Sequence, residues 1–88
     1  MKEATWPLFR IYITMSGRLA LERESNSGPG EHVIDPTAFD ILDYLEDEGP
    51  IYFRVNDSRE EVFGRFGKNW GPSLDDLVRH RFVALDRR

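Results

Sequence analysis

The stretch DPTAFDILDYLEDEGP, residues 35–50, carries the most complete helix pattern in the chain. Asp35 is a residue type that caps helix N-termini, Pro36 suits the first helical position, and Gly49-Pro50 ends a helix. Between these signals the apolar residues recur at the i, i+3, i+4 and i+7 spacing of one helix face. They are Ala38, Ile41, Leu42 and Leu45, and Phe39 widens their stripe. We therefore predict an amphipathic helix over residues 36–48.

The opposite face of this predicted helix is acidic. Asp40, Asp43 and Asp47 recur at i, i+3 and i+7, and Glu46 and Glu48 lie beside them. Like charges at this spacing repel, and carboxylates near a helix C-terminus are disfavoured by the helix dipole, at roughly a few tenths of a kcal/mol each. Two explanations stay open at this point: the acidic face serves solubility, or it meets an electropositive partner.

The N-terminal part of the chain alternates between apolar and polar residues, which is typical of strands. We predict a β-hairpin over residues 6–24, with Ser16-Gly17 as its two-residue turn, because glycine supplies the positive φ that such turns need. Residues 25–30 (SNSGPG) are predicted to be a flexible loop. The apolar positions of the two expected strands are Phe9, Ile11, Ile13, Met15, Leu19 and Leu21.

The C-terminal part is predicted to contain short strands and helices. Residues 51–55 read as a strand, and Ser58 with Glu61 forms a capping box that starts a short helix. A second box, Ser73 with Asp76, starts another helix after the turn-rich residues 66–72, and residues 81–85 read as a terminal strand. Whether residues 59–66 are helix or strand is left open. We expect one α+β domain over residues 1–88, in which a hairpin-containing small antiparallel sheet packs against one long helix and one or two short ones.

Composition excludes several classes of protein. The 88 residues contain no cysteine, which excludes a disulfide scaffold, a thiolate metal site and a cysteine nucleophile. No apolar run approaches the ~18 residues that span a bilayer, and the N-terminus lacks the basic-then-apolar order of a signal peptide. We expect a soluble cytoplasmic protein with no membrane association.

Residues for catalysis are sparse. His32 and His80 lie far apart, and neither has a second ligand type at metal-binding spacing beside it. The segment Gly28-Pro29-Gly30 lacks the Lys-Ser/Thr of a phosphate loop, and Asp75-Asp76 point in different directions on a helix. The sequence therefore predicts no enzyme activity, no metal site and no cofactor.

Charge is distributed unevenly along the chain, whose net charge is −4. Residues 31–61 hold ten acidic and two basic side chains, whereas residues 62–88 hold six basic and three acidic ones. Arginine suits phosphate and guanine contacts, so the basic segment is an alternative nucleic-acid-binding region. Equally, it can complement the acidic helix within the same molecule. Its candidate residues are Lys68, Arg79, Arg81 and Arg87.

Two stretches, residues 33–50 (VIDPTAFDILDYLEDEGP) and residues 77–85 (LVRHRFVAL), resemble parts of winged-helix domains and of precursor-peptide recognition domains. The resemblance implies a regulatory domain that binds DNA through its C-terminal basic region or a peptide along a sheet edge. The strand pattern of residues 51–55 departs from this family, which has a helix there.

A third stretch, residues 66–77 (FGKNWGPSLDDL), resembles the signature of barstar-like ribonuclease inhibitors. In that family acidic residues after the Asn-Trp pair contact the basic active site of a ribonuclease, and Asp75 matches one of them by position. Gly71 stands where the family has another aspartate. The resemblance implies a small stoichiometric inhibitor.

These observations favour a non-catalytic, acidic protein-binding module of the inhibitor type. Its surface would occupy a basic groove of a nucleic-acid-handling protein, as nuclease inhibitors and anti-defence proteins that mimic nucleic acid do. The alternative is the winged-helix-like DNA- or peptide-binding domain. A third hypothesis is a subunit whose sheet edge completes another sheet. The predicted partner-binding residues are Asp40, Asp43, Tyr44, Glu46, Asp47, Trp70 and Asp75.

Overall fold

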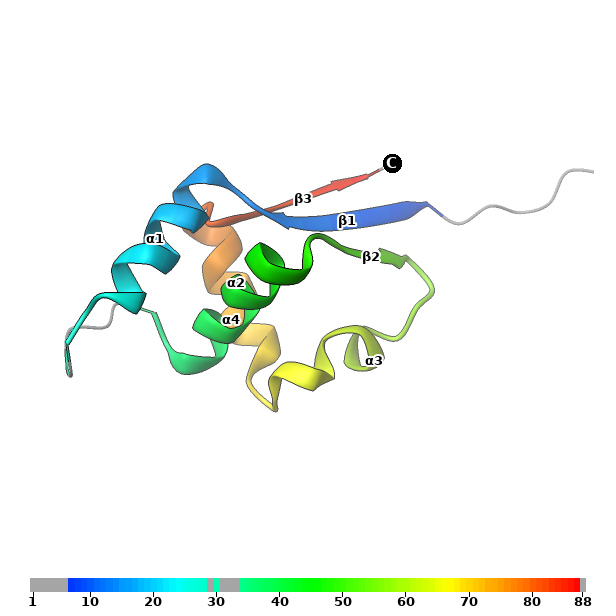
Figure 1. Cartoon of the computed structure of the whole chain (residues 1–88). Helices are drawn as coiled ribbons and strands as arrows, with labels where there is room; N and C mark the ends of the chain where they lie inside the picture. The colour runs from blue at the N-terminus through cyan, green and yellow to red at the C-terminus, as the bar shows by residue number, and fades with distance from the viewer. Residues whose placement is uncertain (1–6, 29, 31–33, 88) are drawn as a thin grey trace, which may run out of the picture.

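The computed structural model describes residues 7–28, 30 and 34–87, which form strands and helices in the order β-α-α-β-α-α-β (Figure 1). The α+β class predicted from the sequence is confirmed. The elements are β1 (Leu8–Ile13), α1 (Met15–Ser25), α2 (Pro36–Glu48), β2 (Ile51–Arg54), α3 (Arg59–Phe63), the 3-10 helix η1 (Gly64–Phe66), α4 (Trp70–Arg79) and β3 (Val83–Arg87).

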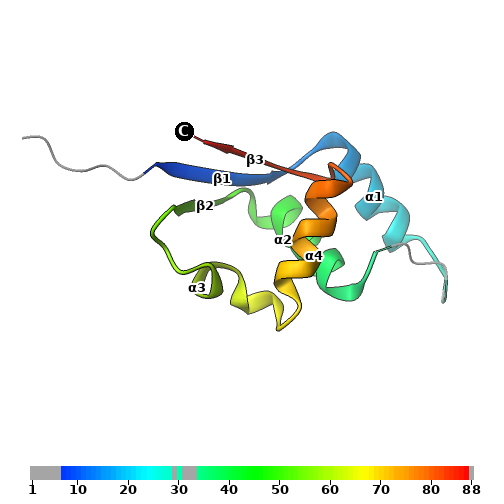
Figure 2. The same ribbon diagram turned by 180° about the vertical axis from the view of Figure 1, so that it is seen from behind.

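The strands form one antiparallel sheet in the order β2-β1-β3. The central strand β1 pairs Phe9 with Phe53 of β2 and Ile11 with Leu85 of β3. Helices α2, α3 and α4 all lie on one side of this sheet, and the two views from front and back agree on this (Figures 1 and 2). The other face of the sheet is uncovered by any described element.

The core lies between the sheet and helices α2 and α4. The predicted apolar stripe of α2 is buried, and its residues Ile41 and Leu42 have no exposed surface. Burying a side chain of this size contributes roughly 1.5–3 kcal/mol. The other members of the core cluster are Ile11, Ile13, Ala38, Leu45, Phe53, Phe63, Leu74, Leu77 and Val83.

The predicted limits of helix α2 are confirmed. The side chain of Asp35 accepts a hydrogen bond from the backbone N–H of Ala38 at 2.6 Å, as an N-cap does. Gly49 follows the helix with φ +97°, a backbone conformation that glycine adopts without strain. The acidic residues predicted for the outer face, Asp40, Asp43, Glu46, Asp47 and Glu48, are all exposed.

The predicted hairpin is wrong, because its second strand is helix α1. The first strand is correct, but Thr14 is an N-cap whose side chain accepts from the N–H of Gly17 at 3.0 Å. Ser16-Gly17 is thus the first turn of a helix, and the buried residues Gly17, Ala20 and Glu24 follow helical spacing. Met15, counted among the apolar positions of the expected first strand, is 68% exposed.

Helix α1 also occupies the first residue of the predicted 25–30 loop, since it ends at Ser25. Asn26 caps it by donating to backbone oxygens of the last turn. Trp6, at which the hairpin was predicted to begin, and Pro29, within the loop, lie outside the described residues.

Helix α3 confirms the N-cap at Ser58, whereas helix α4 begins three residues before the predicted cap at Ser73. Gly71-Pro72 therefore lies in the first turn, where proline costs no hydrogen bond because those N–H groups have no partner within the helix. Ser73 is buried in α4, and its hydroxyl donates to the carboxylate of Asp35 at 2.9 and 3.1 Å.

Strand β3 begins two residues later than predicted, because Arg81 and Phe82 complete the end of α4. The N–H of Phe82 donates to Leu77 O and that of Arg81 to Val78 O, while Arg81 has φ +62°. This is the Schellman arrangement that commonly ends helices. Strand β2 ends at Arg54, so Val55 lies outside it and is 42% exposed.

The first testable prediction concerns Gly17. A Cβ atom there would lie 2.0 Å from the carbonyl oxygen of Phe82, which belongs to the backbone and cannot rotate away. We expect Gly17→Ala to destabilise the fold by about 2 kcal/mol or more in urea unfolding followed by circular dichroism. The matched control is Gly71→Ala in helix α4, where a Cβ meets nothing within 4 Å. This control should change stability much less, because only the local preference of the residue before Pro72 is altered, and equal effects of the two changes would contradict the packing argument.

Candidate functional site

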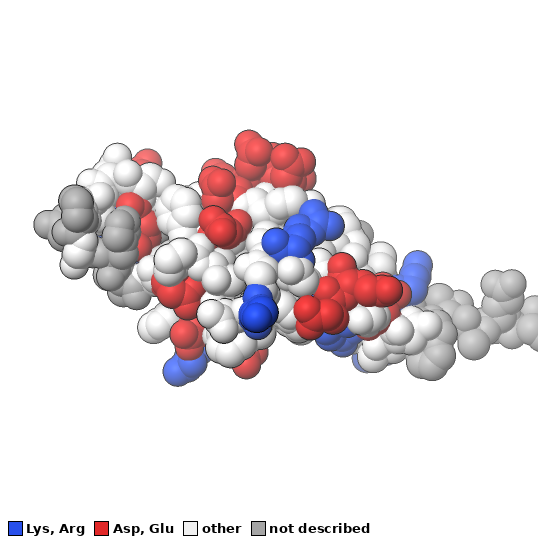
Figure 3. Space-filling model, turned by 90° about the horizontal axis from the view of Figure 1, so that it is seen from below, with Lys and Arg blue, Asp and Glu red and all other residues white. Residues whose placement is uncertain are grey.

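The outer face of α2 and the 3-10 helix η1 border a shallow hollow of about 330 Å³ that is open to solvent. Because the inner stripe of α2 is buried, helical geometry directs the carboxylates at the opposite positions outward into this hollow. Figure 3 shows acidic side chains gathered in groups on the helix-bearing side of the molecule, with basic ones between them. We call this hollow the acidic hollow; it is lined by Asp40, Asp43, Tyr44, Asp47, Glu48, Arg65 and Phe66.

Aromatic side chains form the apolar part of the acidic hollow. The Tyr44 ring meets the Phe66 ring edge to face, with 5.6 Å between centroids. Arg65 places its guanidinium carbon 5.0 Å from the centre of the Tyr44 ring and donates to the Tyr44 hydroxyl from Nη1 at 2.9 Å. These contacts fix the orientation of Tyr44, so an incoming side chain would meet an ordered aromatic wall.

Four carboxylates of the acidic hollow have no ion-pair partner among the described residues, although the guanidinium of Arg65 also lines the hollow. Asp40, Asp43, Asp47 and Glu48 form no ion pair or hydrogen bond within that part of the chain, and the last turn of α2 has no basic residue. The predicted site residue Glu46 differs, because Arg18 Nε contacts its Oε1 at 2.9 Å. Glu46 therefore belongs to an ion pair on the α1 side of the helix and does not line the hollow.

Trp70 and Asp75 lie at a different place from the acidic hollow. Both line an apolar groove of about 410 Å³ between the sheet and helices α3 and α4. The Trp70 indole stacks on Phe63 with 5.2 Å between centroids, and its Nε1 donates to Glu60 at 3.2 Å. The structure thus divides the seven predicted partner-binding residues among three locations.

The alternative basic residues are spread over separate segments. Lys68 is exposed in the turn before α4, Arg81 is exposed after that helix, and Arg87 is exposed in β3. Arg79 ends α4 and pairs with Asp76 one turn earlier, so its charge is compensated locally. The four residues therefore come from the turn, the helix end and the last strand.

Three residues that line the acidic hollow were not predicted as site residues: Glu48, Arg65 and Phe66. Glu48 was noted only as a neighbour of the acidic face. Phe66 stands where the predicted short element of residues 59–66 meets the turn-rich residues 66–72. Arg65 carries no local signal, because its contact with Tyr44 joins residues 21 positions apart. Of these three residues, only Glu48 could have been found from the sequence, through its i+4 spacing from Tyr44 on the predicted helix.

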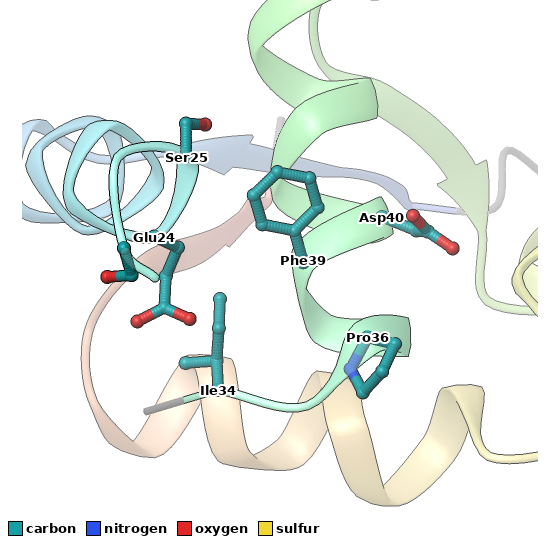
Figure 4. A pocket seen from close by; sticks show the side chains of 7 residues that line it. Glu24, Ser25, Ile34, Pro36, Phe39 and Asp40 are labelled. Atoms are coloured by element: carbon teal, nitrogen blue, oxygen red, sulfur yellow. The ribbon is translucent and has the colours of Figure 1, made fainter. Parts of the chain in front are cut away.

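A further cavity of about 420 Å³ lies between the end of α1 and the start of α2. Figure 4 shows Phe39 directed toward the end of α1, and Glu24 beside Ile34. Glu24 is only 2% exposed, which the sequence did not predict for a charged residue. The neighbouring residues 29 and 31–33 lie outside the described part of the chain.

The structure describes one of the two histidines of the chain. His32 lies outside the described residues, and the exposed His80 stacks on Phe82 with 5.4 Å between ring centroids. The described residues contain no group of three or more histidine and carboxylate side chains arranged to hold a metal ion. Within the same residues, no helix combines the length and the apolar character that crossing a membrane requires.

Comparisons with protein-family models, with curated proteins and with solved structures found no match for this chain. The structure is a small α+β domain with an acidic, partly aromatic hollow on α2, the longest of its described helices.

The repulsion between neighbouring carboxylates of α2 leads to a second prediction. Asp43 and Asp47 repel at i, i+4 spacing, and Asp47 lies near the negative end of the helix dipole. We expect Asp43→Asn/Asp47→Asn to stabilise the fold by about 0.5 kcal/mol in urea unfolding at low salt, and by less in 1 M NaCl. The control Glu22→Gln/Glu61→Gln removes two exposed charges from other helices and should give no gain. Destabilisation by the α2 variant would contradict this account.

Proposed function

We propose that this protein is a small, non-catalytic protein-binding domain of the inhibitor type, and that its acidic hollow binds a basic surface of a nucleic-acid-handling protein. The observation that carries the proposal is the set of carboxylates without ion-pair partners among the described residues, next to an ordered aromatic wall. Because such a cluster lowers the stability of its own helix, its presence is best accounted for by an interaction that uses it.

The chemistry of the hollow suits arginine or lysine side chains of a partner. Carboxylates at the rim accept hydrogen bonds from a guanidinium or ammonium group, and the rings of Tyr44 and Phe66 can pack against its aliphatic part. A row of carboxylates also presents negative charge as phosphates do, so a protein surface built for nucleic acid is the kind of surface that fits. Opposite charge further raises the rate of encounter.

The alternative, direct binding of nucleic acid, has less support. The overall charge is −4, and Arg79 already has a carboxylate partner. A nucleic-acid-binding surface normally gathers unpaired basic side chains on one face. We place the proposed interaction in the cytoplasm, in agreement with the cysteine-free sequence.

The third prediction tests this function by affinity capture from a lysate of the source cells, followed by mass spectrometry. We expect the wild-type protein to capture a nucleic-acid-handling protein at low salt, and excess RNA or DNA to displace it because both compete for one basic surface. Asp43→Asn/Asp47→Asn should lose this capture, whereas Glu22→Gln/Glu61→Gln, with the same change in charge, should retain it.

Two results would contradict the proposal. One is equal capture of the same proteins by both double variants, which would mean that the acidic hollow is only a solvated face. The other is capture of nucleic acid itself, which would favour the basic C-terminal residues Lys68, Arg79, Arg81 and Arg87. Circular dichroism of each variant confirms that a loss of capture does not come from unfolding.

A further inference from the structure

The apolar groove between the sheet and helices α3 and α4 is open to solvent along strand β3. Two of its apolar residues, Leu85 of β3 and Val78 of α4, are 52% and 44% exposed. The groove lining is otherwise aromatic and aliphatic, with one cation and one carboxylate. Its residues are Phe9, Ile11, Phe53, Arg59, Phe63, Trp70, Leu74, Asp75, Val78 and Leu85.

The groove adjoins a free sheet edge. Strand β3 pairs with β1 on one side, and Figure 2 shows no described element along its other side. The N–H of Thr14 donates to Phe82 O, and hydrogen-bonded pairs alternate along an antiparallel ladder. The main chain of Ala84 and Asp86 therefore faces β1, whereas that of Leu85 and Arg87 faces outward. Since Val83 is buried, the open part of the edge runs from Leu85 to Arg87.

The two charged residues that line the groove, Arg59 and Asp75, differ in their contacts. Arg59 lies over the Phe53 ring at 4.5 Å and donates to the backbone oxygen of Asp57 at 3.1 Å, so its guanidinium is already engaged. Asp75 is exposed and forms no ion pair or hydrogen bond with another described residue. Arg59 keeps its positive charge, so the groove holds one cation and one carboxylate, and the carboxylate of Asp75 is the one without an ion-pair partner among the described residues. Asp75 can therefore accept a basic residue of a ligand.

We propose that strand β3 and this groove form a docking site for an extended segment of a partner protein, one that carries apolar residues at alternate positions and a basic residue that reaches Asp75. The segment adds to the sheet by pairing its main chain with Leu85 and Arg87. Because directly paired residues point to the same face, its residue opposite Leu85 enters the groove next to Val78 and Trp70. This site is separate from the acidic hollow and does not depend on the function proposed for it.

The experiment uses a phage-displayed library of random heptapeptides, selected on the wild-type protein and, in parallel, on Leu85→Lys. Lysine on an edge strand opposes strand addition and places a charge in the groove. The matched control is Leu19→Lys, the same change at a residue of α1 that is 61% exposed. We expect peptides with alternating apolar residues and an arginine or lysine to be enriched on the wild type and on Leu19→Lys, but not on Leu85→Lys.

A selected peptide is then synthesised with a fluorescent label, with and without N-methyl groups on the residues that face β3. Fluorescence anisotropy should show binding weakened about tenfold or more by Leu85→Lys and by N-methylation, and weakened at high salt or by Asp75→Asn. Amide chemical shifts should move at Leu85 and Arg87, together with the indole N–H of Trp70.

Four outcomes would overturn the proposal. The first is a library that yields no peptide enriched over the Leu85→Lys background. The second is binding that N-methylation leaves unchanged, and the third is shifts confined to α2, which would assign the peptide to the acidic hollow. The fourth is a wild-type protein that sediments as a dimer while Leu85→Lys is a monomer, since the occupant would then be a second copy of this chain.

Discussion

The carboxylate of Asp35 fixes helix α2 both along its own axis and against its neighbour α4. One oxygen accepts the N–H of Ala38 and so begins the helix at Pro36, and both oxygens accept the hydroxyl of Ser73 in α4. The rotation of α2 about its axis follows from this anchor and from the burial of Ile41 and Leu42 beneath the sheet. Since the acidic residues occupy the opposite positions of the same helix, the geometry of the acidic hollow depends on that rotation.

The elements with local signals were predictable, and those fixed by distant contacts were not. Helix α2 has its cap, its period and its stop within sixteen consecutive residues, so its limits and its acidic face follow from the sequence. Helix α1 was mistaken for a strand because Gly17 was interpreted as a turn glycine. A glycine is needed at position 17 because the carbonyl oxygen of Phe82 lies where a Cβ would be. Phe82 also accepts a hydrogen bond from the side chain of Thr14, which is 68 positions away in the sequence. No local pattern encodes such a contact.

The residues of the candidate site also fall into a group that the sequence predicts and a group that only the fold brings together. Its α2 members share one helix face, so their grouping followed from a spacing of three and four residues. Arg65 and Phe66 join them only because the chain returns past α2 after strand β2. Trp70 and Asp75 were grouped with the acidic face by chemistry alone, but α4 carries them to the groove beneath the sheet. Distances between elements decide such groupings, and composition does not.

The sheet order β2-β1-β3 has a kinetic consequence. The central strand is the first described element and β3 the last, so the pairing of Phe9 with Arg87 closes a loop that contains every other element. Contacts of such high sequence separation slow folding, because the entropy of loop closure must be lost before they form. Until β3 docks, one edge of β1 stays open beside the apolar side chains of Ile11 and Ile13. A chain in that intermediate state would be the form most exposed to aggregation, and the rate at which α4 delivers β3 would set its lifetime.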